Sequence, residues 1–264
     1  MPQLRREFLR HVLTLGLAST LVGGLGMIGG CRQAPRRKYS GKHVLRPSLD
    51  ASTGLPLLEL PEGFRYFTFA WAGESLTDGG TIPAAADGMG IVATAGNVVT
   101  LVRNQEIVTS SGAFGAPDSA YDSSCGGGCV RLRVDLTTES LLSAETALSG
   151  TLVNCAGGVT PWGSWLSCEE IVISNDQIRP VKQGDGRDAS LRRPHGLVFE
   201  VNGSGPAQSQ PIPDMGIFRH EAVAFDTSTG QAYLTEDRDD ECGFYRFTPR
   251  QPGQLQAGGK LEML

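Results

Sequence analysis

The sequence predicts an all-β protein built from many short strands and turns. Of its 264 residues, 35 are glycine and 15 are proline, and both residue types interrupt the interior of a helix. Charged residues make up 19% and aromatic residues 7% of the chain, which argues against a coiled coil and against a charge-rich disordered protein. The formal net charge of −5 provides no basic surface, so we expect no nucleic-acid partner.

The N-terminal segment, residues 1–31, has the layout of an export signal. A basic stretch containing Arg5-Arg6 precedes an uncharged apolar run over residues 12–30. The arginine pair resembles a twin-arginine signal, although Leu4 departs from that pattern. We therefore expect export by the bacterial twin-arginine machinery to the periplasm or cell envelope. A plain secretory signal or a single N-terminal anchor is the alternative.

The apolar run ends at Cys31, in a loose match to a bacterial lipoprotein cleavage box. A diacylglyceryl group on this cysteine would tether the mature protein to a membrane surface. Residues 32–60 begin with basic side chains and are punctuated by proline, which predicts a linker. We expect residues 61–264 to form the folded domain.

Three segments of this domain share one plan, in which an apolar strand with a polar or acidic end is followed by a later strand. The three segments are 98–106 followed by 129–135, 162–170 followed by 195–201, and 230–237 followed by 243–247. A β-rich unit that recurs at about 65 residues predicts a β-propeller with long loops. Because about 200 residues hold about three such units and propellers usually close with 4–8 blades, we expect an incomplete propeller. A β-sandwich with similar strands is the alternative.

The repeats place polar acceptors at comparable points. They are Asn104 and Glu106, Glu169 and Glu170, and Glu236 and Asp237, with Asn154-Cys155 and His220-Glu221 opening the strands that precede the last two pairs. In a propeller these groups would converge on one axis, where crowded carboxylates raise one another's pKa unless cations bind. Oxygen ligands suit Ca²⁺ or Mg²⁺, and a thiolate among them favours iron or zinc. Solvated loop acids are the alternative.

Two blocks of the sequence resemble the PhoX-type alkaline phosphatase family of secreted bacterial enzymes. The first block is NCAGGVTPWGSWLSCEE at residues 154–170, and the second is HEAVAFD at 220–226, followed by YLTED at 233–237 and GFYRF at 243–247. Asn104-Gln105-Glu106 is similar to an Asn-His-Glu segment of the family, with Gln105 in place of histidine. The resemblance covers roughly residues 55–250, and it agrees with the twin-arginine signal.

This resemblance implies a β-propeller phosphatase that hydrolyses phosphate monoesters with bound Fe³⁺ and Ca²⁺. Cys155 would be the iron thiolate, and Asn154 would donate to the substrate or orient Cys155, so both are expected catalytic residues. Clustered cations would neutralise the oxygens of the phosphate ester. The metal ligands implied are Cys155, Glu169, Glu170, Glu221, Glu236 and Asp237. The substrate contacts implied are Asn104 and Arg238, although a surface ion pair is the alternative for Arg238.

Two features depart from the family pattern. Cys125 and Cys129 stand where Thr-like residues are expected, and with one metal thiolate the five cysteines after Cys31 allow two disulfides. Cys125–Cys129 is the expected pair, and a Cys-x3-Cys zinc half-site is the alternative, although no second pair of suitable spacing supports it. The family's later Arg-Pro-Glu-Asp-type and Pro-Asp-Asn-type segments do not occur before Leu264.

The missing segments make the chain resemble an N-terminal portion of the family, so its own phosphatase activity is an open question at this point. The first alternative is a non-catalytic, metal-binding β-propeller of the cell envelope. The second is a lipid-tethered interaction module without metals.

Overall fold

The computed structural model describes residues 44–264, except 109–111, 117–118, 175–179 and 183–187. The expected export signal, the cysteine at position 31 and the first part of the expected linker therefore lie outside the described residues. Residues 44–264 belong to one compact unit. In the described part of the chain, no helix has the length and apolar character that a membrane crossing requires.

The described residues confirm the predicted all-β class. The helical elements with assigned bounds are two short 3₁₀ turns, η3 (Pro213–Met215) and η4 (Leu255–Ala257). The strands are β1 (Arg46–Ser48), β2 (Leu58–Leu60), β3 (Ala86–Ala95), β4 (Val98–Gln105), β5 (Gly127–Asp135), β6 (Ser140–Thr151), β7 (Asn154–Val159), β8 (Ser164–Glu169), β9 (Pro180–Lys182), β10 (Asp188–Ser190), β11 (Val198–Asn202), β12 (His220–Asp226), β13 (Gln231–Glu236), β14 (Phe244–Pro249) and β15 (Gly259–Met263).

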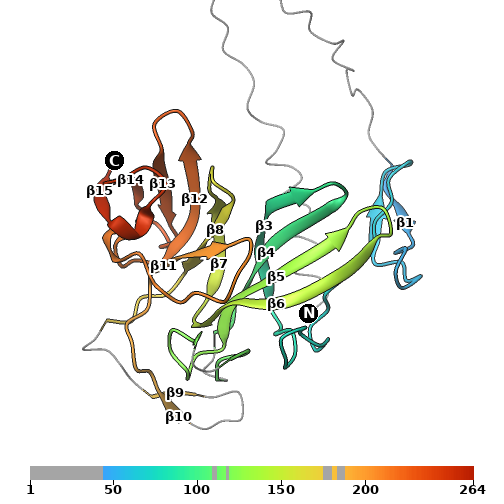
Figure 1. The fold of residues 1–264 in the computed structure, drawn as a ribbon, viewed down its shortest axis with the longest axis horizontal. Coiled ribbons are helices and arrows are strands. Elements are labelled where there is room, and N and C mark those ends of the chain that lie inside the picture. The colour runs from blue at the N-terminus through green and yellow to red at the C-terminus, as the bar shows by residue number, and fades with distance from the viewer. Residues whose placement is uncertain (1–43, 109–111, 117–118, 175–179, 183–187) are drawn as a thin grey trace, which may run out of the picture. The chain divides into compact units, whose positions relative to one another are not determined.

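Three antiparallel sheets make up most of the unit. Their strand orders are β3-β4-β5-β6, β7-β8-β11 and β12-β13-β14-β15. In each sequence repeat, the first strand and the later strand are hydrogen-bonded neighbours in the structure, as β4–β5, β8–β11 and β13–β14. The sheet β7-β8-β11 lies between the other two, and β7 contacts both β3 and β12 (Figure 1).

Part of the expected linker is structured. Strands β1 and β2 form an antiparallel pair within residues 44–60. The side chain of Asp50, in the connection between them, accepts hydrogen bonds from the hydroxyl of Thr53 at 2.6 Å and from the backbone N–H of Thr68 at 2.9 Å. This segment therefore packs on the domain, and a two-stranded pair replaces the linker over these residues.

Two cores fill the space between neighbouring sheets. One packs β8 and β11 against the C-terminal sheet and includes Leu166, Val198 and Phe247. The other packs the first sheet against the middle one and includes Leu148 and Phe199. Strand β13 alternates between buried and more exposed residues, as expected for a strand with one covered face. Strand β5 is almost entirely buried because both of its faces are covered.

Candidate metal centre

The first two strands of each large sheet form the same antiparallel hairpin. In each one, the first residue of the first strand pairs with the last residue of the second, as Ala86–Gln105, Asn154–Glu169 and His220–Glu236. The residue after the second strand then donates its backbone N–H to the carbonyl of the residue before the first. These bonds run from Glu106 to Ala85 (2.7 Å), from Glu170 to Val153 (2.8 Å) and from Asp237 to Arg219 (3.0 Å). The sequence repeat is therefore a structural repeat.

A β-bulge follows each of these paired ends. The register shifts between Ala86 and Met89, between Asn154 and Gly157, and between His220 and Val223. A bulge adds a residue to one strand and changes the direction of a side chain. The second residue of each bulged strand is Asp87, Cys155 or Glu221. The fold thus repeats two ligand positions per hairpin, one at the bulge and one directly after the second strand.

These positions bring a thiol and carboxylates together. The Sγ atom of Cys155 lies 3.3 Å from Oε2 of Glu221. One ligand atom from each of Cys155, Glu170 and Glu221 lies within 4.8 Å of the others. The thiol is buried and both carboxylates are half-buried. One soft sulfur ligand and two oxygen ligands at such distances suit a single transition-metal ion.

Two further carboxylates adjoin this group from the first sheet. Glu106 follows β4 and shares a hydrogen bond with Asp87 of β3. Burial raises the pKa of Glu106, and the charges of Asp87 and Glu170 raise it further. Such shifts arise where anions crowd without a cation between them. Carboxylate oxygens grouped in this way are the ligands that Ca²⁺ prefers.

The third sheet adds an acid and a cation. Asp237 shares a hydrogen bond with Glu170, and the Arg219 Nη2 atom lies 2.8 Å from Oε1 of Glu170. Burial raises the pKa of Glu170, as do Asp237 and Glu221, while the Arg219 guanidinium opposes them. The side chain of Arg219 is 43% exposed. It is thus a positive group at the accessible side of an anionic cluster.

Two glycines allow the first strands to approach so closely. A Cβ atom on Gly88 would lie 2.7 Å from the carbonyl oxygen of Cys155, and one on Gly158 would overlap the carbonyl oxygen of Val223. No real Cβ atom tolerates such contacts, so any other residue would push β7 away from β3 or β12. The spacing between Cys155 and Glu221 therefore depends on glycine at position 158.

Asn104, expected to contact substrate, is fully buried and contacts the start of β7. Its Nδ2 donates to the carbonyl oxygens of Cys155 (3.2 Å) and Ala156 (2.7 Å). Its Oδ1 accepts hydrogen bonds from Trp165 Nε1 (2.9 Å) and Ser167 Oγ (2.9 Å). All polar atoms of this amide are used internally, so Asn104 is a positioning residue for the start of β7.

Asn154 and Arg238 both have protein partners in the structure. Asn154 is fully buried and bonds to Thr151 Oγ1 at 2.6 Å and Ser167 Oγ at 2.9 Å, which holds the strand before Cys155. Arg238 is largely exposed and its guanidinium lies 3.7 Å from Glu241. This contact is the surface ion pair that was the alternative for Arg238.

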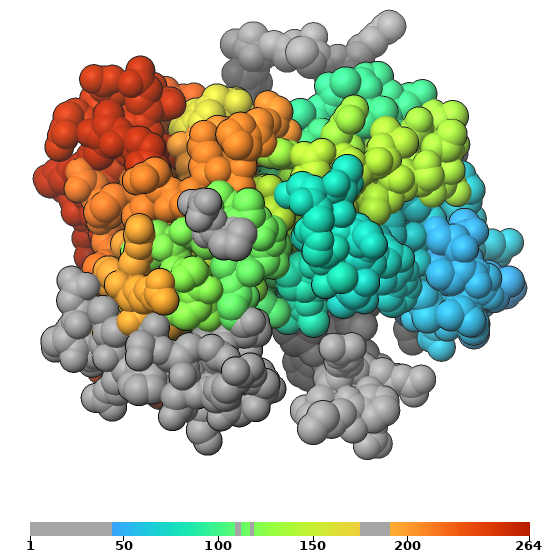
Figure 2. Space-filling model, turned by 60° about the horizontal axis from the view of Figure 1, so that its bottom comes forward, coloured from blue at the N-terminus to red at the C-terminus, as the bar shows by residue number. Residues whose placement is uncertain are grey.

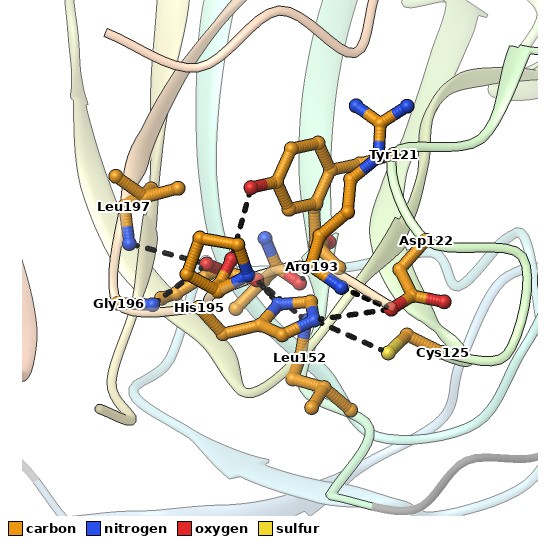
Figure 3. A network of polar contacts seen from close by, with 12 residues as sticks. Tyr121, Asp122, Cys125, Leu152, Arg193, His195, Gly196 and Leu197 are labelled. Carbon is orange, nitrogen blue, oxygen red and sulfur yellow. Dashed lines mark hydrogen bonds and ion pairs between the residues drawn. The ribbon is translucent and has the colours of Figure 1, made fainter. Parts of the chain in front are cut away.

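Glu236 and Glu169, both expected as metal ligands, also have other partners. Oε2 of Glu236 accepts from Tyr245 Oη at 2.9 Å. Glu169 is fully buried, and its Oε1 lies 2.7 Å from Nδ1 of His195. Figure 3 shows the network of polar contacts around His195. Burial alone would lower the pKa of His195, but Glu169 and the other hydrogen-bonding partners raise it to about 12. The adjacent side chains of Glu169 and Glu170 therefore belong to two different clusters, one around His195 and one around Cys155.

The expected Cys125–Cys129 disulfide is wrong. All five cysteines among the described residues are free thiols. Sγ of Cys125 lies 3.4 Å from Nε2 of His195, whereas Sγ of Cys129 lies 3.1 Å from Oδ1 of Asn104. Because the two sulfurs have different partners, the Cys-x3-Cys pair is also no zinc half-site.

Sequence reasoning missed Asp87 and Arg219. Asp87 occupies the bulge position of the first hairpin, like Cys155 and Glu221, but β3 is longer than β7 and β12. Asp87 is therefore further in sequence from the second strand of its hairpin than Cys155 and Glu221 are, so the sequence did not show that the three positions are equivalent. Arg219 directly precedes β12, where the backbone bond to Asp237 marks it as the counterpart of Val153.

Fold and site define an all-β protein with three repeated hairpins whose equivalent positions gather a thiol and several carboxylates. The family described as Alkaline phosphatase PhoX matches residues 128–264, just over half of the chain. The chain therefore belongs to the PhoX alkaline phosphatase family, which confirms the resemblance noted above. No curated protein and no solved structure gave a significant match.

Proposed function

We propose that this chain is a metal-dependent phosphatase that hydrolyses phosphate monoesters with bound Fe³⁺ and Ca²⁺. The observation that carries the proposal is the convergence of Cys155, Glu170 and Glu221 from equivalent positions of the repeated hairpins. Membership of the PhoX alkaline phosphatase family supports the reaction class. We also infer that the three large sheets are blades of a β-propeller, since the first strand of the middle sheet, β7, adjoins both β3 and β12.

The donor set fits the proposed ions. A thiolate with carboxylates suits iron, so Cys155, Glu170 and Glu221 would hold Fe³⁺. Further carboxylates, from Asp87, Glu106 and Asp237, suit calcium. Metal binding requires the proton of the Cys155 thiol, which now points to Glu221 at 3.3 Å, to leave for solvent, because thiol and carboxyl ligands bind in their deprotonated forms.

When bound, the ions would neutralise phosphate oxygens and lower the pKa of a coordinated water molecule. The protein's own contribution is to hold the ligands and orient the ester. Arg219 offers charge-assisted N–H donors beside Glu170, and we assign it to the phosphate oxygens. Asn104 keeps the carbonyl groups of Cys155 and Ala156 in place and so fixes the position of the thiol.

The export signal predicted by residues 1–31 would deliver the protein through the twin-arginine machinery to the periplasm or cell envelope. A lipid on Cys31 would tether it there. The partner we propose for the domain itself is a small phosphate ester and not a nucleic acid, since the net charge is −5.

The decisive experiment measures metal content and turnover of a chromogenic phosphate monoester by the full chain supplied with Fe³⁺ and Ca²⁺. We expect the wild type and a Cys242→Ser control, altered at an exposed thiol, to contain iron and hydrolyse the ester. The Cys155→Ala variant should lose both. Bound iron and calcium without turnover would identify a non-catalytic metal-binding protein instead, and absence of both metals from the wild type would refute the proposal.

A further inference from the structure

A second cluster of ligand atoms lies in the network around His195 (Figure 3). Nε2 of His195 lies 3.4 Å from Sγ of Cys125 and 3.8 Å from Oδ2 of Asp122. One ligand atom from each of these three side chains lies within 4.8 Å of the others, and all three residues are buried. None of them takes part in the centre formed by Cys155, Glu170 and Glu221.

We propose that Asp122, Cys125 and His195 form a separate, buried Zn²⁺ site. Ligands about 2.0–2.3 Å from a tetrahedral zinc ion lie about 3.5 Å from one another. The two separations that involve His195, 3.4 and 3.8 Å, agree with that spacing. Sulfur, imidazole nitrogen and carboxylate oxygen are the three donor types that zinc takes in proteins.

The surroundings of His195 are those of a metal-binding imidazole. Zinc-bound histidines donate their other ring N–H to a carboxylate, which fixes the tautomer. Here Nδ1 of His195 lies 2.7 Å from Oε1 of Glu169, so Nε2 is the atom turned toward Asp122 and Cys125. Glu169 is itself held by the backbone N–H groups of Leu152 (2.8 Å) and Gly196 (2.9 Å).

The other carboxylate is held just as firmly. Oδ2 of Asp122 accepts from the backbone N–H groups of Arg192 (2.5 Å) and Arg193 (3.1 Å). Its Oδ1 accepts from the hydroxyl of Ser124 at 2.6 Å. The ligand positions therefore exist before any ion binds, which lowers the cost of ordering them.

Zinc binding at this site needs no redox step. Zinc is bound by a thiolate and by a ring nitrogen without its proton, so the proton on Sγ of Cys125 and any proton on Nε2 of His195 would go to solvent. A water molecule would complete the coordination.

The site would connect segments that are distant in the chain. Asp122 and Cys125 precede β5, while His195 precedes β11. In the space-filling view, the green segment before β5 lies beside the orange segment before β11 (Figure 2). A zinc ion there would act as a structural cross-link between two sheets, independent of the phosphatase centre.

The test uses the full chain with Cys155→Ser, which removes the thiolate of the other centre. With Co²⁺ in place of zinc, we expect a thiolate-to-metal charge-transfer band in the near ultraviolet. Adding Cys125→Ser should abolish the band, whereas adding Cys129→Ser, a buried thiol bonded to Asn104, should leave it intact. X-ray absorption of the zinc-loaded Cys155→Ser protein should show one sulfur ligand and nitrogen or oxygen ligands.

Zinc should also raise the melting temperature of the Cys155→Ser protein by several degrees, because it binds only the folded state. A band that persists without Cys125 would overturn the proposal, as would zinc absorption without a sulfur ligand. If Cys125→Ser prevents folding, the Cys155→Ser spectra alone decide, since no thiolate signal there excludes the site. Loss of phosphatase activity has no bearing on these readouts, so this proposal and the proposed function fail separately.

Discussion

Cys155 and Glu221 occupy the same position in two neighbouring hairpins, and their side chains meet with Sγ 3.3 Å from Oε2. Each is the second residue of a strand that bulges directly after its first paired residue. The bulges thus turn the side chains of these two residues toward the same point, where they can act as metal ligands together.

Changing Glu221 to Gln should lower the affinity for iron by at least about 10–100-fold. This is the usual loss of metal affinity when a residue that only supports a metal ligand is changed. The amide keeps the size of the side chain but cannot supply a negative oxygen. Iron per chain, measured after dialysis, checks this. The matched control is Glu236→Gln, whose carboxylate bonds Tyr245 outside the cluster; equal iron loss in both variants would contradict the assignment.

Asn104→Ala should destabilise the protein by about 1–3 kcal/mol, because the carbonyl groups of Cys155 and Ala156 would lose their buried donor. Urea denaturation measures the change. We also expect weaker metal binding without any change in ligand identity. The dissociation constant for iron should rise, while the absorption band of the Cys155 thiolate–iron bond should stay unchanged. Unaltered metal affinity would show that Asn104 does not position Cys155.

Gly158→Ala should separate β7 from β12 and so increase the distance between Cys155 and Glu221, since a Cβ atom would overlap the Val223 carbonyl. Relief of such overlap costs about 1–3 kcal/mol. Metal content should fall together with stability. Gly54→Ala is the comparison, because position 54 has φ of 71° and open space around it; it should lower stability without loss of metal.

Glu169→Gln should lower the free energy of unfolding by about 3–5 kcal/mol, the usual consequence of removing one member of a buried ion pair. The imidazole of His195 would then lose its charged partner at Nδ1. Denaturation by guanidinium chloride gives the value. A change below 1 kcal/mol, that is, about the size expected for a surface substitution, would mean that the pair does not stabilise the fold.

Asp50 should make stability depend on pH in the acid range. Burial raises its pKa, but hydrogen bonds from Thr53, Ser52 and Thr68 lower it more, to about 2, against 3.8 for the free side chain. A lowered folded-state pKa means that this contribution is fully present above about pH 4 and is lost as the pH falls toward 2. The melting temperatures of wild type and Asp50→Asn should therefore converge as the pH falls from about 5 to about 2, which is roughly the interval over which this contribution is lost. A constant difference across this range would contradict the prediction.

The strand repeat could be predicted because each unit is local in sequence. The segments 98–106, 162–170 and 230–237 have apolar cores and polar ends, and in the structure each pairs with the later strand of the same repeat. Cys155 and Glu221 could be found for the same reason, since they open the strands that precede two of these segments. Asp87 was missed because the first hairpin is longer.

The sequence by itself determined the all-β class, the three repeated strand pairs and the family. Only the tertiary structure decided which way neighbouring side chains face. Glu169 and Glu170 are adjacent in the chain, yet one bonds His195 and the other adjoins Cys155 and Glu221. Successive residues in extended chain point to opposite sides, and the bulges then shift that alternation. A list of acidic residues therefore cannot state which of them share a site.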